Sequence, residues 1–343
     1  MTLVERVIDW ATRFAFSQTA TLLGEFCGTA LLSEDTIWRL CQAQADQIEQ
    51  EQQRAITMVQ QQSEQDLPSP QFVAPTTLAP DALYDPASQE FVVLTDAIGV
   101  PSQKPTRQRA GQERKSKEAK RHDTDVFVLP RQDGGEQFVC EGLRETYSCV
   151  SAVGAFLRQE WSGCALAVVA ITDGATKIRS DLGQIFGERV RVILDWYHLA
   201  KRVRENLSMI ACGKEQREEW EEHLLPLLWN GQVDAARAFV AELSARRELA
   251  KAALLGYLDK HASEIIDYGR RQDAGKPIGS GRMEKAVDQV IGQRQKNRGM
   301  SWTKEGSRAL AMLTVAKLNA RDALSTLNAL KDPSRSALCS STA

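Results

Sequence analysis

The chain has 343 residues, enough for about two domains of ordinary size. It is 43% hydrophobic and 26% charged, which is ordinary for a soluble globular protein. No apolar run approaches the ~20 residues of a membrane span, and no signal peptide is evident, so a cytoplasmic protein is expected. The net charge of −2 argues against a uniformly basic nucleic-acid binder.

Cysteine spacing argues against two kinds of site, and the basic residues are concentrated in two stretches of the chain. The seven cysteines are scattered and include no C-x-x-C pair, so neither a zinc knuckle nor a disulfide framework is supported. Residues 103–121 carry eight Lys or Arg against two Glu, and a second basic stretch runs from Lys276 to Lys304. Such local patches can hold a DNA backbone, although a solvated surface loop explains residues 103–121 equally well.

The first 66 residues are predicted to be helical. Amphipathic patterns cover Val4–Phe16 and Gln18–Phe26, and Ser33 is placed to cap a third helix. Helices joined by a short glycine-containing turn fit a DNA-binding helix-turn-helix, although any small helical bundle gives the same pattern. The third helix is expected to continue through Gln42–Gln65 as a solvated spacer or a short coiled coil. Five prolines then mark residues 67–89 as a linker.

Residues 90–330 have the pattern of a mixed α/β domain. Strands are expected at Glu90–Asp96, Thr124–Leu129, Glu136–Glu141, Ala165–Thr172 and Val190–Leu194. Helices at Tyr147–Trp161 and Thr176–Phe186 alternate with the later strands, which implies parallel pairing there. Three consecutive strands followed by this alternation give the order of an RNase H-like sheet, in which the first and fourth strands are neighbours. We expect the first strand to end at Asp96, with residues 98–101 turning away from it.

An all-α insertion interrupts this domain after the fifth strand. Leu199–Arg271 has helical spacing throughout, and we place the insertion at about residues 205–272. A loop containing Gly279-Ser280-Gly281 follows, and then a helix over Arg282–Gly292 that carries Glu284 in its first turn. A last helix is expected over Ala309–Leu330, and residues 331–343 form a polar tail.

Three carboxylates stand where a two-metal site would need them. Asp96 and Asp173 follow neighbouring strands, where functional groups of such sheets collect, and Glu284 lies on a helix expected to pack beside the sheet. Converging carboxylates repel one another unless a cation lies between them, and Mg²⁺ or Mn²⁺ suits oxygen ligands. Two such ions can activate an attacking oxygen and stabilise a leaving oxygen on phosphorus. Taken singly, each residue could instead be a helix cap, a turn residue or a solvated side chain.

An ordered set of short motifs extends this hypothesis. The motifs are Asp173-Gly-Ala, Asp195-Trp-Tyr-His198, Gly279-Ser-Gly-Arg-Met-Glu284, Gly292-Gln-Arg294 and Gly299-Met-Ser-Trp302. From about Val92 to Leu318, the chain resembles the DDE transposases of bacterial insertion sequences related to the Mutator group. The resemblance implies that Asp96, Asp173 and Glu284 are the catalytic, metal-binding triad. It also implies that Asp195 and His198 form the auxiliary Cys/Asp-x-x-His signature of that group. Their spacing lets the two side chains share a helix face, as it would in a plain structural pair.

The reaction implied by the resemblance is metal-assisted phosphoryl transfer on DNA. Water attacks the phosphodiester at the transposon end, and the freed 3′-hydroxyl then attacks target DNA, so no covalent protein–DNA intermediate is needed. The implied partners are transposon-end and target DNA and further copies of the chain in a synaptic complex. The protein would then associate with the nucleoid when bound to DNA. Basic residues near Glu284 are the expected DNA contacts: Arg282, Arg294, Lys296 and Arg298.

Two other functions fit part of the sequence. A repair or junction-cutting nuclease of the RNase H-like class would use the same carboxylates, but the helical insertion argues against it. A non-catalytic or decayed transposase-derived protein would bind DNA without cutting it.

Trp302 could stack on a flipped base, although burial suits this indole better.

Overall fold

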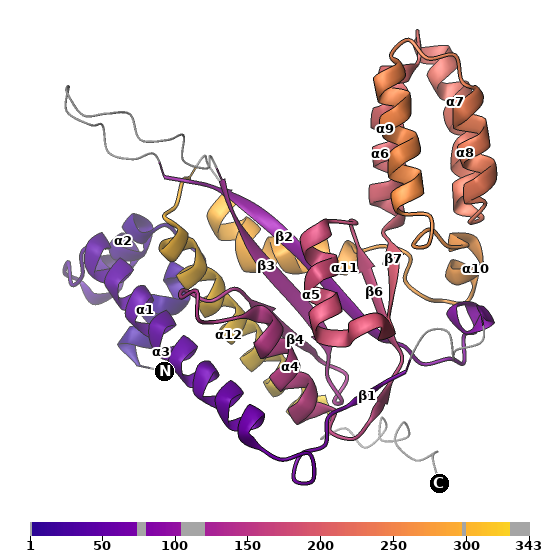
Figure 1. Cartoon of the computed structure of the whole chain (residues 1–343). Coiled ribbons are helices and arrows are strands. Elements are labelled where there is room, and N and C mark those ends of the chain that lie inside the picture. Colours follow the sequence, from indigo (N-terminus) through magenta and orange to yellow (C-terminus); the bar gives the residue numbers. More distant parts are fainter. Residues whose placement is uncertain (1, 74–79, 104–120, 297–299, 330–343) are drawn as a thin grey trace, which may run out of the picture. The chain divides into compact units, whose positions relative to one another are not determined.

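The computed structural model describes residues 2–73, 80–103, 121–296 and 300–329 (Figure 1). The predicted tail at 331–343, Arg298 and nearly all of the basic segment at 103–121 lie outside these residues. Five strands form one sheet in the order β4-β3-β2-β6-β7. Their bounds are Phe91–Pro101 for β2, Arg121–Pro130 for β3, Glu136–Cys140 for β4, Val168–Thr172 for β6 and Val190–Leu194 for β7.

The sheet is mixed, as the sequence predicts. Strand β6 lies between β2 and β7 and pairs in parallel with both, whereas β3 and β4 form an antiparallel hairpin. The first and fourth predicted strands are therefore neighbours. N-terminal helices, a five-stranded mixed sheet and a helical region together confirm the predicted α/β class.

The prediction that the first strand ends at Asp96 is wrong. Strand β2 continues to Pro101, so Asp96 lies inside it. Ile98 and Val100 are buried while Gly99 between them is half-buried, which is the period-two alternation of a strand. The Pro101 carbonyl accepts a hydrogen bond from the Trp302 amide at 3.0 Å, which gives the end of the strand a partner despite the proline.

The described chain divides into two compact units. The first unit comprises residues 1–70, 96–164 and 283–343, and the second comprises residues 71–95 and 165–282. The predicted domain at 90–330 contributes to both units, and the N-terminal helices belong to the first.

The helices of the first unit pack around its long third helix. This unit contains α1 (Leu3–Ala11), α2 (Phe16–Cys27), α3 (Glu34–Gln61), α4 (Cys149–Glu160) and α12 (Lys304–Ala329). Helix α3 buries Ile37, Cys41 and Ala45 and packs against α12 and α4. Its Glu49, only 2% exposed, accepts hydrogen bonds from the Leu143 and Arg144 amides. Helix α3 is thus a core helix and not a solvated spacer, because its i, i+4 apolar stripe has partners from distant parts of the chain.

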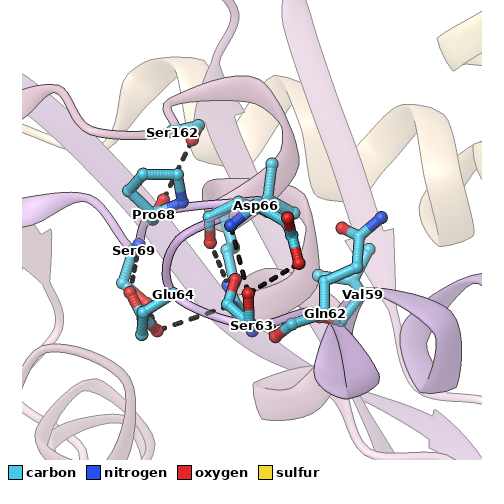
Figure 2. A network of polar contacts seen from close by, with 10 residues as sticks. Val59, Gln62, Ser63, Glu64, Asp66, Pro68, Ser69 and Ser162 are labelled. Carbon is cyan, nitrogen blue, oxygen red and sulfur yellow. Dashed lines mark hydrogen bonds and ion pairs between the residues drawn. The ribbon is translucent and has the colours of Figure 1, made fainter.

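Helix α3 ends at Gln61, earlier than predicted. The Arg158 guanidinium of α4 donates to the carbonyls of Val59 and Gln62, which the end of a helix leaves without partners. Figure 2 shows the turn that follows, in which the Ser63 hydroxyl donates to Asp66 at 2.6 Å. Beyond this turn, the Ser162 hydroxyl donates to the Pro68 carbonyl at 3.0 Å (Figure 2). The start of the predicted linker is therefore held against the first unit.

The second unit contains β6, β7 and the predicted helical region. Helix α5 (Thr176–Phe186) connects β6 to the short turn before β7, and five helices follow β7: α6 (Trp196–Ile210), α7 (Lys214–Trp229), α8 (Val233–Glu242), α9 (Glu248–Lys260) and α10 (Tyr268–Asp273). Helices α6 and α8 each contact α7 and α9, so the four form a bundle (Figure 1). Buried Val203, Leu224 and Leu254 contribute to its core. None of the described helices is long and apolar enough to cross a membrane.

Two parts of the predicted linker are ordered within the second unit. Strand β1 (Gln71–Phe72) pairs in parallel with β5 (Ala165–Leu166). The short 3₁₀ helix η1 (Pro80–Tyr84) is tied to α10, because Arg271 donates to the Leu83 carbonyl at 3.1 Å. Arg271 also binds Glu90 through both of its terminal nitrogens, at 3.0 and 2.6 Å. A buried ion pair from outside the segment thus orders part of what composition alone identifies as a linker.

Candidate active site

Asp96 lies half-buried within β2, in the first unit. Its Oδ1 accepts a hydrogen bond from the Ala97 amide at 2.7 Å. Partial burial and the positive charge of Arg121 lower the pKa of Lys296, whereas the carboxylates of Asp96 and Asp288 act in the opposite direction. Asp96 therefore lies within electrostatic range of the basic side chain of Lys296.

Asp173 follows β6 in the second unit and begins a tight turn. Its Oδ1 accepts a hydrogen bond from the Ala175 amide at 2.8 Å, and the Gly174 amide donates to the Thr172 hydroxyl at 3.2 Å. Gly174 has a φ of +84°, a backbone conformation that favours glycine. The turn residue role that the sequence allows for Asp173 is therefore real. It uses one carboxylate oxygen and leaves the second for other partners.

The strand register relates the two aspartates. The last residues that pair along β2 and β6 are Leu94 and Ile171. Asp96 and Asp173 each follow a member of that pair by two residues. Neighbouring parallel strands thus carry a carboxylate at corresponding points of their sequences.

Glu284 is exposed on α11 (Gly281–Val287). The helix predicted through Gly292 changes character after Val287, since residues Asp288–Lys296 form the π-helical segment η3. Segments of π-helix are rare and are frequent at functional sites. A Cβ at Gly292 would lie 2.3 Å from Asp288 Oδ1, so any other residue there would require the Asp288 side chain to move.

The three predicted metal ligands are distributed over both units: Asp96 and Glu284 belong to the first and Asp173 to the second. Within the described part of the chain, no group of three or more His, Cys, Asp or Glu side chains is arranged to hold a metal ion. The donor set itself suits Mg²⁺, which binds through one or two carboxylates and keeps several waters or phosphate oxygens. The triad assignment stays a prediction.

Asp195 is buried at the N-terminus of α6 and caps that helix. Its Oδ1 accepts hydrogen bonds from the Tyr197 and His198 amides, at 2.6 and 3.0 Å. The His198 ring is less close, with Nδ1 3.6 Å from the same oxygen. The predicted contact between the pair is therefore made by the backbone of His198, at the distance of a hydrogen bond.

The second oxygen of Asp195 binds the loop that precedes Glu284. Both the amide and the hydroxyl of Ser280, a residue 85 positions away, donate to Asp195 Oδ2. Burial alone would raise the pKa of Asp195, but the contact with His198 and the hydrogen bonds from Ser280 outweigh it and lower the pKa to about 2. Asp195 thus fastens the Gly279-Ser280-Gly281 loop to the start of α6, a partner that sequence spacing did not reveal.

Because this pKa is lowered, Asp195 should stabilise the protein above pH ~4 and lose that contribution as the pH falls towards ~2, a difference of about 2–3 kcal/mol. We therefore expect Asp195→Asn to be less stable than wild type by this amount at pH 6, and the gap to close on acidification. Urea unfolding at several pH values measures it. Asp234→Asn, at a side chain that is 97% exposed, is the control. A gap that stays constant between pH 6 and pH 3 would contradict the assignment.

The candidate DNA contacts separate into surface and core residues. Arg282 and Lys296 are exposed, whereas Arg294 is only 5% exposed. The Arg294 guanidinium donates to the Ala11 carbonyl at 3.0 Å and lies over the rings of Phe16 and Trp302. Burial lowers its pKa to about 10. Arg294 is therefore part of the core of the first unit, and we no longer count it among the DNA contacts.

Trp302 is half-buried, and whether it stacks on a base stays a prediction. Its indole nitrogen donates to the Gln295 carbonyl at 3.0 Å.

The N-terminal helices carry a net negative charge. Residues 1–66 contain four arginines and no lysine against ten acidic residues. Glu34 and Asp35 begin α3, and Arg39 pairs with Asp35 at 2.9 Å. Affinity for DNA comes mainly from cations that neutralise phosphates. The predicted helix-turn-helix is therefore a three-helix unit with a net negative charge, and its binding to DNA stays a prediction.

One further group near Asp173 was missed by sequence reasoning. His261, Glu264 and Arg179 share short contacts in the second unit, next to Gly174. The i, i+3 spacing of His261 and Glu264 was a visible signal, but the sequence gives no way to know that Arg179 joins them.

Comparisons with known proteins give no independent assignment. Models of known protein families do not match the chain, and a search of curated proteins finds no relative.

Proposed function

We propose that this protein is an RNase H-like DDE transposase that cleaves DNA at the ends of an insertion sequence and joins the freed ends to target DNA. Asp96, Asp173 and Glu284 are the proposed ligands of two Mg²⁺ or Mn²⁺ ions. The observation that carries the proposal is the pairing of β2 with β6, with an aspartate two residues beyond the Leu94–Ile171 pair on each strand. A shared metal site on such a sheet requires carboxylates that are carried by neighbouring strands.

The surroundings of the aspartates fit this role. Asp96 and Asp173 are half-buried, and each has an oxygen oriented by a backbone amide of its own segment. Bound metal ions would supply activation of the attacking oxygen and stabilisation of the leaving oxygen. The chain itself orients the two aspartate carboxylates through the Ala97 and Ala175 amides. Exposed Lys296 and Arg282 are proposed to bind the DNA backbone by neutralising phosphates.

Asp195 and Ser280 have a supporting role in this proposal. Their hydrogen bonds fix the loop from which α11, the helix of Glu284, begins. His198 lies in the first turn of α6, three residues after Asp195, the residue that binds this loop.

The test uses DNA duplexes that carry the sequences flanking the gene on each side, incubated with the purified full chain. We expect Mg²⁺-dependent nicking at the ends of flanking inverted repeats, followed by joining of the 3′ ends to a target plasmid, and no product with a chelator present. Cleavage without strand joining would favour the nuclease alternative. Absence of any metal-dependent product on this DNA would overturn the proposal.

A second candidate is a non-catalytic, transposase-derived DNA-binding protein. It is favoured by one observation, that the described residues include no group of three or more His, Cys, Asp or Glu side chains arranged to hold a metal ion. This candidate predicts binding to the flanking DNA that survives both chelation and substitution of the triad. The same assay, with a binding measurement added, separates the two functions.

A further inference from the structure

The segment that leaves the helical bundle returns to the ends of β6 and β7. Helix α9 ends at Lys260, and residues 261–268 lead from it to α10. The Glu264 carbonyl accepts a hydrogen bond from the Leu194 amide at 3.0 Å, and the Tyr268 hydroxyl donates to the Leu194 carbonyl at 2.8 Å. This segment is therefore bonded to the last residue of β7, in the same unit as Asp173.

His261 is a buried polar residue of this segment and has partners on two sides. It is 2% exposed, and its Nδ1 lies 2.7 Å from Glu264 Oε2. Arg179 of α5 donates to the same Glu264 oxygen at 2.7 Å. Helix α5 begins directly after the Asp173–Ala175 turn. The cluster thus joins the end of the bundle to the helix that follows the turn.

The imidazole edge lies directly on the backbone of the turn. A Cβ built on Gly174 would be 2.3 Å from His261 Cε1 and 3.0 Å from Nδ1, closer than real Cβ atoms approach. His261 therefore occupies the space that any side chain at position 174 would need. Since Gly174 follows Asp173, a shift of His261 would be passed to the backbone that carries the carboxylate.

We infer that His261 is a positioning residue for Asp173: clamped by Glu264 and Arg179, it holds the Asp173–Ala175 turn and couples this turn to the helical bundle. His261, its two partners and the turn all belong to the second unit. The effect of His261 on metal binding rests on the proposed function, in which Asp173 is a metal ligand. Residues that orient a ligand from behind usually change metal affinity by about 10–100-fold when they are replaced.

Amide hydrogen exchange on the full chain tests the holding of the turn without any activity. We expect His261→Ala to speed exchange of the Gly174–Lys177 amides by about tenfold or more, because the turn opens locally once its cover is removed. His261→Asn, which retains a polar atom near the Nδ1 position, should restore part of the protection. Val240→Ala, a truncation of a fully buried side chain in α8, is the control for general loosening of the bundle.

Glu264→Gln is the second variant should His261→Ala fail to fold. It keeps the shape of the cluster but removes the charge that holds His261 and Arg179, and the same rise in exchange is expected. Exchange at residues 174–177 no faster than in Val240→Ala, in whichever of the two variants folds, would overturn the inference.

Metal dependence supplies the second measurement. In His261→Ala, the Mn²⁺ concentration for half-maximal DNA cleavage should rise by about 10–100-fold, and in Val240→Ala it should not change. An unchanged Mn²⁺ requirement in His261→Ala would overturn the positioning role. Absence of cleavage by the wild-type protein would instead overturn the proposed function, and the exchange experiment would then decide alone whether His261 holds the turn.

Discussion

Replacing Asp173 with asparagine should lower the rate of metal-dependent DNA cleavage by about 10³-fold or more, a loss of about 4 kcal/mol of transition-state stabilisation. Asparagine retains the side-chain oxygen that accepts the hydrogen bond from the Ala175 amide at 2.8 Å. The turn should therefore survive, while the negative charge that attracts a divalent cation is lost. Steady-state cleavage of duplexes carrying the flanking DNA, together with a thermal unfolding curve, measures both quantities.

Asp133→Asn is the matched control for this substitution. Asp133 also accepts a hydrogen bond from the amide two residues ahead, Gly135, at 2.9 Å, in the hairpin turn between β3 and β4. The control thus makes the same chemical change in the same kind of turn, away from the proposed ligands. Equal activity in Asp173→Asn and Asp133→Asn would reduce Asp173 to a turn residue and contradict the triad.

The largest stability effect is expected for Arg271→Met, which should lower the free energy of unfolding by about 3–5 kcal/mol, the usual cost of breaking a buried ion pair. The Arg271 side chain is fully buried and the Glu90 side chain is 5% exposed. Removal of the Arg271 guanidinium leaves Glu90 with its ion pair to Lys276, at 2.8 Å. It also removes the donors to the carbonyls of Leu83 and Pro277. Urea unfolding of the full chain gives the difference.

Arg270→Met tests whether this effect comes from burial. Arg270 is the preceding residue, and it pairs with Asp81 at 3.1 Å, but its side chain is 56% exposed and that of Asp81 is 78% exposed. Surface pairs of this kind contribute about 0–1 kcal/mol. If the two arginine variants lost similar stability, the buried pair would not be what fastens η1 and the start of β2 to α10.

Local patterns in the sequence were enough to find most strands and helices. Val190–Leu194 is a strand with the predicted bounds, and Ser33 caps α3 through the Thr36 amide at 3.2 Å. These features depend on residues two to four positions apart, which the sequence displays directly. The errors arose where distant residues intervene. Arg158 binds the carbonyls where α3 ends, and the Trp302 amide binds the Pro101 carbonyl at the end of β2, beyond Asp96.

The candidate site residues likewise separate into those whose strands the local sequence predicts and those whose surroundings depend on distant residues. The sequence alone identifies Asp96 and Asp173 on strands that an RNase H-like order makes neighbours, and β2 does pair with β6. It also marks Arg294 as a basic residue close to Glu284, but not as a core residue bonded to Ala11, 283 positions away. Charge in a sequence does not reveal whether a side chain is solvated or has been matched with a carbonyl and two rings.

Amino-acid periodicity by itself determined the α/β class and the helical region of this protein, because amphipathic spacing records which face of each element is buried. The order of the elements added the prediction that the first and fourth strands are neighbours. Only the tertiary structure decided the partners of the polar groups: Ser280 for Asp195, Glu90 for Arg271, and His261 for the turn after Asp173. A buried polar group must find a hydrogen-bonding partner wherever the fold brings one within reach, and that distance is set by packing rather than by position in the chain.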